Sequence, residues 1–105
     1  MNINEFTTVT FENKEFTIRP MIVCNDGFKM SVQGSQGHYC SPREVSSIFS
    51  SMEIGYPSQE EPLIYEYAED KSRLTDTVYG WVPTDVIQQV IEKHGGINIL
   101  KTFKN

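Results

Sequence analysis

Apolar and polar residues alternate along much of the first half of the chain, which is the pattern typical of β-strands. Residues 7–11 and 16–18 are rich in β-branched and aromatic side chains, which favour strands. The residues between them, 12–15, are polar and few, so the two segments are expected to form a hairpin. Pro20 cannot donate a hydrogen bond to a β-ladder and is expected at a sheet edge.

The strand pattern continues through residue 33. Residues 21–24 are predicted to form a buried strand. They are followed by Asn-Asp-Gly at 25–27, and Asp-Gly is a favoured pair in tight hairpin turns. Residues 28–33 alternate again, so Phe28, Met30 and Val32 are expected to point into the core.

Three further strands are expected in the second half, over residues 51–56, 77–82 and 97–103. Trp81, which lies in the second of these, is predicted to be a core residue. Residues 57–76 contain two prolines and six acidic residues and are predicted to form a long surface excursion. Within it, residues 63–67 are expected to be a short strand or an anchoring segment.

The most regular segment is an amphipathic helix predicted over residues 83–94. Its apolar residues recur at helical spacing and form one stripe: Val86, Ile87, Val90 and Ile91. A proline suits the first turn of a helix, and the pair Gly95-Gly96 suits its end. The whole pattern predicts an α+β fold, with a small, mainly antiparallel sheet and this C-terminal helix packed on one face.

Length and charge narrow the functional classes. The 105 residues are enough for a single domain, residues 1–105, with one core. The formal net charge is −5, and residues 46–80 hold seven of the fourteen acidic residues but only two of the nine basic ones. Phosphate neutralisation needs a basic face, so no direct binding of DNA or RNA is expected. An acidic region suits a basic partner surface, or is simply solvated.

The location of the protein can also be predicted. The sequence has no run of about 18 apolar residues and no basic, then apolar, N-terminal leader. We therefore expect no membrane association, a cytoplasmic location, and reduced thiols at Cys24 and Cys40.

One loop, residues 31–43, collects most of the residues that could carry function. It holds glycines, a histidine, a cysteine, a tyrosine and an arginine, and such groups on a flexible backbone are typical of recognition loops. The predicted ligand- or partner-binding residues come from this loop and from one tyrosine further along the chain: Gln33, Gly34, Gly37, His38, Tyr39, Cys40, Ser41, Arg43 and Tyr56.

Two chemical alternatives for this loop remain open. The amides of residues 34–37 could cradle an anion, with Tyr39 and Arg43 forming the walls of a nucleotide site. Alternatively, His38 and Cys40 lie two residues apart and could form a nucleophilic pair. No family signature accompanies either set, so no catalytic residue is assigned. The spacing of the cysteines and histidines matches no zinc motif, so no metal and no cofactor is expected.

Several segments together resemble a group of small bacteriophage and prophage proteins that have no established activity. The segments are 26–33, 38–43, 53–57, 65–70 and 78–96, and they include His38-Tyr39-Cys40-Ser41-Pro42-Arg43 and Glu53-Ile54-Gly55-Tyr56-Pro57. The resemblance implies a viral accessory protein made in the cytoplasm of a host bacterium. Such proteins are often antagonists of host defence, either anti-CRISPR-like inhibitors that bind a host protein or sponges for signalling nucleotides. A homo-oligomer is compatible with either role.

Overall fold

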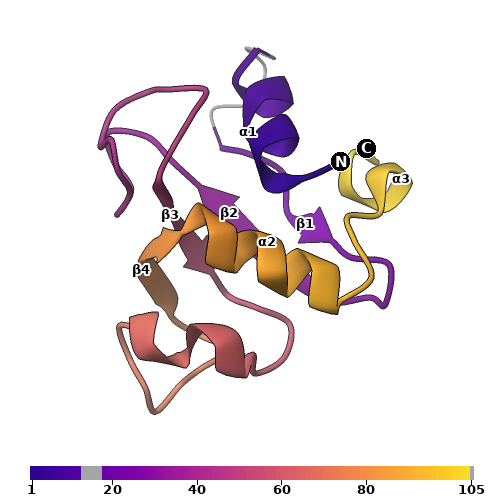
Figure 1. The fold of residues 1–105 in the computed structure, drawn as a ribbon. Helices are drawn as coiled ribbons and strands as arrows, with labels where there is room; N and C mark the ends of the chain where they lie inside the picture. The colour runs from indigo at the N-terminus through magenta and orange to yellow at the C-terminus, as the bar shows by residue number, and fades with distance from the viewer. Residues whose placement is uncertain (13–17, 105) are drawn as a thin grey trace.

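The computed structural model describes residues 1–12 and 18–104, which form an α+β fold (Figure 1). A four-stranded antiparallel sheet in the order β1-β2-β3-β4 is combined with helices, which confirms the predicted fold class. Along the chain the elements are α1 (Ile3–Glu12), β1 (Ile22–Val23), β2 (Lys29–Gln33), β3 (Ser51–Gly55), the 3₁₀ helix η1 (Pro62–Tyr67), β4 (Val78–Pro83), α2 (Thr84–Lys93) and α3 (Ile99–Thr102).

The predicted alternation holds in the central strands. β1 and β2 form a hairpin in which Ile22 pairs with Met30, and the turn contains Gly27 at a φ of 95°, which glycine adopts without strain. In β2, Met30 and Val32 are fully buried, as predicted. β3 follows the same rule, because Val32 pairs with Ile54 and Ile54 is also fully buried.

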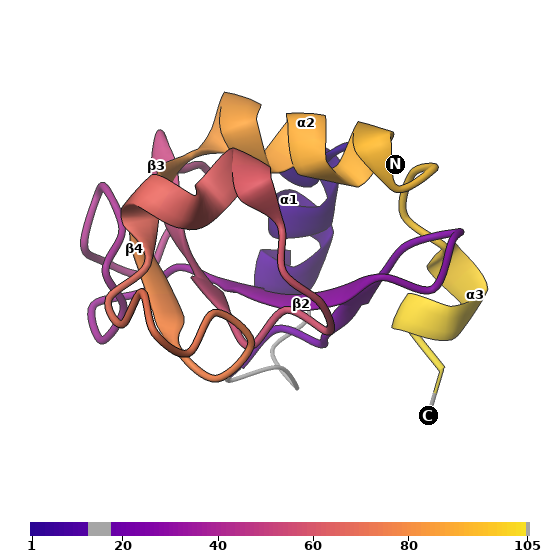
Figure 2. The same cartoon turned by 90° about the horizontal axis from the view of Figure 1, so that it is seen from below.

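The predicted C-terminal helix is confirmed as α2. Ile87, Val90 and Ile91 are buried on one stripe, and Gly95 and Gly96 follow the helix with φ values of 87° and 91°. Figure 2 shows α2 on one side of the sheet, with α1 and η1 on that same side. The burial of this stripe against the sheet forms the centre of the core.

The strand predicted over residues 7–11 is wrong, because this segment belongs to helix α1. Asn2 and Glu5 cap the start of the helix reciprocally, since each backbone N–H donates to the other residue's side chain at 3.2 and 2.8 Å. The hydroxyls of Thr7 and Thr10 donate to carbonyls four residues earlier, so buried β-branched residues are accommodated in the helix. The predicted turn at 12–15 and strand at 16–18 fall almost wholly outside the described residues.

Two strands expected in the second half are not formed. Residues 63–67, expected to be a short strand or an anchoring segment, belong to η1, which is anchored by the fully buried Ile64. The Glu61 side chain caps η1 by accepting a hydrogen bond from the N–H of Leu63. Ile97 forms a single bridge with Cys24, after which the chain turns into α3 instead of a strand. The side chain of Asn98 caps α3, and such a cap favours a helix start over an extended continuation.

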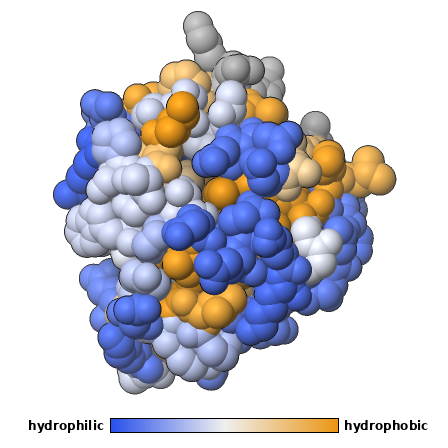
Figure 3. Space-filling model, in the orientation of Figure 1, coloured by the Kyte–Doolittle hydropathy of each residue, from blue (hydrophilic) through white to orange (hydrophobic). Residues whose placement is uncertain are grey.

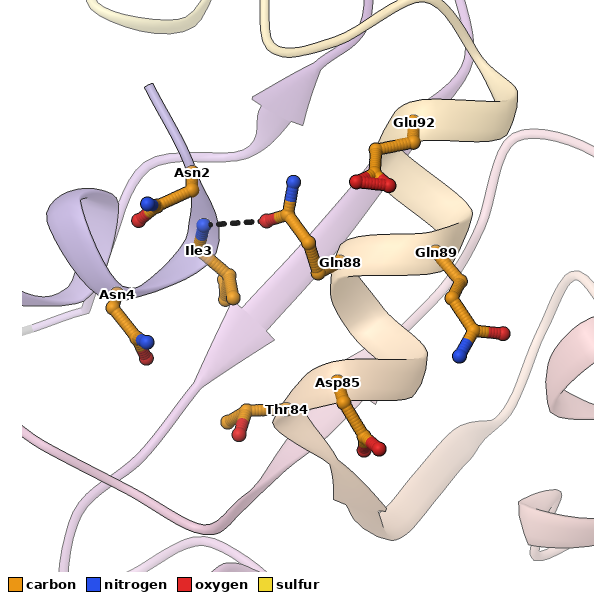
Figure 4. Close-up of a pocket in the computed structure, with 8 residues that line it drawn as sticks. All are labelled: Asn2, Ile3, Asn4, Thr84, Asp85, Gln88, Gln89 and Glu92. Atoms are coloured by element: carbon orange, nitrogen blue, oxygen red, sulfur yellow. Dashed lines mark hydrogen bonds between the residues drawn. The ribbon is translucent and has the colours of Figure 1, made fainter.

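A polar cleft of about 320 Å³ lies between the beginning of α1 and one side of α2 (Figure 4). The side chain of Gln88 spans it and accepts a hydrogen bond from the N–H of Ile3 at 2.8 Å. This bond satisfies one of the free amides at the start of α1 and ties the helix to α2. We interpret the cleft as a structural joint.

Replacing Gln88 with alanine should therefore loosen α1. We expect Gln88→Ala to lower the free energy of unfolding by about 1–2 kcal/mol, because the buried amide of Ile3 loses its partner. Gln89→Ala is the matched control, since Gln89 is exposed on the same helix, and its effect should stay within about 0.5 kcal/mol. Urea denaturation measures both values, and equal values for the two variants would contradict the structural role of Gln88.

In residues 1–12 and 18–104, no helix combines the length and the apolar character needed to cross a membrane.

Candidate functional site

The end of the predicted recognition loop is held against the sheet by main-chain hydrogen bonds. Ser41 donates to the carbonyl of Ser51 at 3.1 Å, and the two residues form an isolated β-bridge. The N–H of Tyr39 donates to the carboxylate of Glu53 at 2.8 Å, and its carbonyl accepts from the N–H of Trp81 at 2.9 Å. Tyr39 is thus held on both sides, between β3 and β4.

Trp81 lies at an irregularity in β4. Met52 pairs with Val82 and Ile54 with Tyr79, so the single residue Glu53 in β3 lies opposite both Gly80 and Trp81. Such a β-bulge redirects the side chains of the longer strand.

The backbone of Trp81 has a φ of 51°, which is rare for a bulky residue. Its side chain is 50% exposed. The prediction that Trp81 belongs to the core is therefore wrong, because the extra residue in β4 turns the indole away from the interior.

The exposed indole stacks on Tyr39. The two ring centroids are 4.9 Å apart with an interplanar angle of 27°, and the guanidinium of Arg43 lies 5.2 Å from the centroid of the Tyr39 ring. We call Tyr39, Arg43 and Trp81 the aromatic face. A Cβ at Gly80 would lie 3.3 Å from the Cβ of Tyr39, so this glycine allows the loop to approach β4 closely.

Next to the aromatic face is an open hollow of about 350 Å³, which we call the Trp81 hollow. It is lined by Tyr39, Tyr67, Glu69, Gly80 and Trp81. η1 supplies Tyr67, and burial together with the charges of Glu66 and Asp85 raises the pKa of the Tyr67 phenol.

The acidic segment that carries Glu69 is tied to the sheet. The N–H of Glu69 donates to the carbonyl of Val78 at 3.0 Å, and the preceding Ala68 bridges to Tyr79. This docking places Glu69 in the lining of the Trp81 hollow together with three aromatic residues. Apolar side chains reach the surface over η1 and over α3 on the face seen in Figure 3.

Other predicted binding residues have structural roles. Gln33 is buried and exchanges two hydrogen bonds of 2.8 Å with the backbone of Arg19. Gly34 is packed against Phe49, since a Cβ there would lie 2.6 Å from the aromatic ring. Tyr56 is exposed, with a φ of 50°, but it does not line the Trp81 hollow. These three residues are separate from the aromatic face.

Two amides of the loop donate hydrogen bonds within the loop itself. Ser35 accepts from Gly37 N–H at its hydroxyl, 3.0 Å away, and from His38 N–H at its carbonyl, 3.3 Å away. The hydroxyl of Ser35 also lies 2.6 Å from Nδ1 of His38. Arg43 contacts Tyr39 but does not line the hollow. This geometry does not support the anion cradle or the nucleotide walls that the sequence suggested.

The thiol of Cys40 is buried and used in hydrogen bonds. Its Sγ donates to the carbonyls of Ser35 and Pro42, at 3.2 and 3.3 Å, while His38 is bonded to Ser35. Burial raises the pKa of the Cys40 thiol, which lowers the fraction of reactive thiolate. The geometry therefore gives the predicted Cys40–His38 pair no support.

Both thiols should react slowly in the folded protein. Cys24 and Cys40 are each 1% exposed, and burial raises the pKa of Cys24 to about 11, with the charge of Asp26 adding to the effect. Under native conditions, Ellman's reagent should react with both thiols only slowly. In guanidinium, which unfolds the protein, it should react with both quickly. If one thiol reacted rapidly in the native protein and this reaction were lost in Cys40→Ala, the prediction of slow reaction would be wrong. Cys40 would then again be a candidate nucleophile.

A second cluster of titratable residues surrounds the buried imidazole of His94. Nδ1 of His94 is 2.6 Å from the Asp26 carboxylate and Nε2 is 2.7 Å from Glu61. Lys93 donates to the other oxygen of Glu61 at 2.8 Å, and the Phe28 ring stacks on the imidazole with centroids 4.0 Å apart. We call Asp26, Glu61, Lys93 and His94 the His94 cluster.

The hydrogen bonds of the His94 cluster shift the pKa values of its two carboxylates. Burial by itself would raise the pKa of Glu61, but hydrogen bonds from Lys93, the Leu63 N–H and His94 together lower it. The hydrogen bond from the N–H of Phe28, followed by that from His94, lowers the pKa of Asp26.

The sequence did not predict this cluster. Glu61 lies in the segment 57–76 that was predicted to be a surface excursion, but it is 1% exposed, and His94, at the end of the predicted helix, is 4% exposed. The only local signal is Pro62, which makes Glu61 a candidate helix cap. Since the cluster joins the β1–β2 turn, η1 and α2 through the buried Glu61 and His94, we assign it a structural role. In the described part of the chain, no group of three or more His, Cys, Asp or Glu residues is arranged to hold a metal ion.

No protein-family model, curated protein or solved structure matches the chain. The resemblance to small phage proteins therefore stays a prediction.

Proposed function

We propose that this protein is a non-enzymatic binding protein that recognises a partner protein through the aromatic face. In this proposal it is a phage accessory protein that acts in the host bacterial cytoplasm and inhibits a host defence protein by occupying its surface. The observation that carries the binding role is the exposed stack of Trp81 on Tyr39, with Arg43 against it.

The backbone conformation of Trp81 supports a functional role. A left-handed conformation is unfavourable for a residue with a side chain, by about 1–2 kcal/mol, and such strain concentrates at functional sites. Here it holds a large aromatic ring at the surface, where burial contributes little to folding. Tryptophan, tyrosine and arginine are the residue types most enriched among interface hot spots.

The alternative functions have less support. A nucleotide sponge needs amides free to bind phosphate, but within the predicted cradle the amide of Gly37 already donates to the hydroxyl of Ser35. A cysteine-dependent enzyme needs an accessible thiolate, but Cys40 is buried. The aromatic face needs no rearrangement before it can bind.

The test is affinity capture from a bacterial lysate with three forms of the protein as bait. Wild type should retain a partner, and the double variant Tyr39→Ala/Trp81→Ala should lose it. Leu100→Ala is the matched control. Leu100 is 86% exposed on α3, so this substitution removes apolar surface away from the aromatic face. The control should retain the partner as wild type does.

The inhibitory role has its own readout. In a bacterium that carries the captured defence system, wild-type protein should restore phage plating, whereas the double variant should not. Equal capture and equal plating by wild type and by the double variant would contradict the proposal. Thermal melting of each variant, compared with wild type, shows whether a loss reflects binding or unfolding.

A further inference from the structure

We infer that the Trp81 hollow binds a cationic side chain, arginine or lysine, presented by the partner protein. This inference rests on the proposed function and specifies the chemistry of the partner surface. The hollow is walled by the rings of Tyr39, Tyr67 and Trp81 and by one acid, Glu69.

The aromatic walls supply the first part of the recognition. The faces of tryptophan and tyrosine rings carry negative charge density and attract cations within about 6 Å. The Tyr39 ring already makes such a contact with Arg43, at 5.2 Å. The rings of Tyr67 and Trp81 extend the same chemistry into the hollow.

Glu69 supplies the second part. It is exposed, and among the described residues its carboxylate forms no ion pair or hydrogen bond. A cation that enters the hollow meets this carboxylate as well as the rings.

The surrounding charge favours the same occupant. Residues 46–80, which supply Tyr67, Glu69 and Gly80 to the hollow, carry seven acidic and two basic side chains, and the net charge of the chain is −5, so a basic partner surface is attracted to the protein. The volume of about 350 Å³ is near the lower end of the roughly 300–1,000 Å³ typical of small-molecule sites. It suits one side chain better than a nucleotide.

Trp81 makes the inference directly testable, since it is the only tryptophan in the chain. Its fluorescence should be followed during titration with the capped peptides Gly-Gly-Arg-Gly-Gly and Gly-Gly-Lys-Gly-Gly, and with the neutral citrulline analogue of the arginine peptide. We expect a saturable change with the arginine and lysine peptides, and binding about fivefold weaker or more for the citrulline peptide.

Two charge variants separate the hollow from general electrostatics. Glu69→Gln should weaken binding of the arginine peptide by about threefold or more, because a carboxylate next to the cation is lost. Glu92→Gln is the matched control, since it removes the same charge from an exposed position on α2, and it should leave binding unchanged. An equal loss in both variants would overturn the inference.

The outcome also distinguishes this inference from the proposed function. No fluorescence change with either cationic peptide, or an equal response to the citrulline peptide, overturns cation recognition. If the Tyr39→Ala/Trp81→Ala variant still loses the captured partner in that case, the binding role stands and only the chemistry of the occupant is wrong. If capture is also unaffected by the double variant, both proposals fail.

Discussion

Replacing Glu61 with glutamine should lower the free energy of unfolding by about 3–5 kcal/mol, the range for breaking one partner out of a buried ion pair. Glu61 is 1% exposed and accepts hydrogen bonds from both His94 and Lys93. A neutral amide removes the negative charge that faces Lys93, and its NH2 group cannot accept one of the two hydrogen bonds that the carboxylate oxygens form with Lys93 and His94. In a chain of this size, such a loss lowers the melting temperature by more than about 10 °C.

The control is Glu60→Gln, the adjacent residue in the sequence. Glu60 is exposed, and its carboxylate accepts one surface hydrogen bond, from the Tyr65 hydroxyl at 3.2 Å. This variant should change stability by less than about 0.5 kcal/mol. Equal melting temperatures for Glu61→Gln and Glu60→Gln would show that the His94 cluster does not stabilise the fold.

The same cluster predicts the acid response of the protein. The pKa of Glu61 is lower in the folded protein than its ordinary value, so its stabilising effect is complete above the unfolded value of about 4.3. The effect is lost as the pH falls through the lower, folded pKa, because protonation removes the carboxylate. Asp26 acts in the same direction. Between neutral and acidic pH, the melting temperature should therefore fall more steeply for wild type than for Glu61→Gln.

Replacing Trp81 with glycine should weaken partner binding strongly and leave the fold nearly intact. Removing a hot-spot residue typically reduces binding by about 2 kcal/mol or more, which is about a 30-fold increase in Kd. On stability, three effects of similar size oppose one another. Relief of the left-handed backbone gains about 1–2 kcal/mol, while glycine flexibility costs about 0.5–1 kcal/mol and loss of the stack on Tyr39 about 0.5–1.5 kcal/mol.

Calorimetry with the captured partner measures the change in Kd, and urea denaturation of the free protein measures the change in stability. Leu100→Ala should leave Kd unchanged. If Trp81→Gly instead lowered stability by more than about 3 kcal/mol, Trp81 would be part of the core, and its exposed position in β4 would not reflect a binding role.

The comparison of sequence and structure separates local from non-local determinants. Strands β2, β3 and β4 and helix α2 were predictable because their apolar residues repeat at intervals of two, or three and four, and their ends carry turn or capping residues. Helix α1 was not predictable from the sequence, because its threonines and phenylalanines favour strands locally. Its helix depends on the cap formed by Asn2 and Glu5 and on the burial of Phe6, and tertiary burial overrides weak propensity.

The features of the candidate site also separate into those that the sequence predicts and those that depend on the tertiary structure. The sequence by itself determined the fold class, the main strands and the long helix, because these depend on residue type and short-range spacing, and it singled out Tyr39 and Arg43 as candidate binding residues. Only the tertiary structure decided that Trp81 is exposed and that Glu61 is buried beside His94. The first depends on an extra residue in β4 opposite Glu53. The second depends on an ion pair between residues 33 positions apart, and neither arrangement leaves a periodic pattern in the chain.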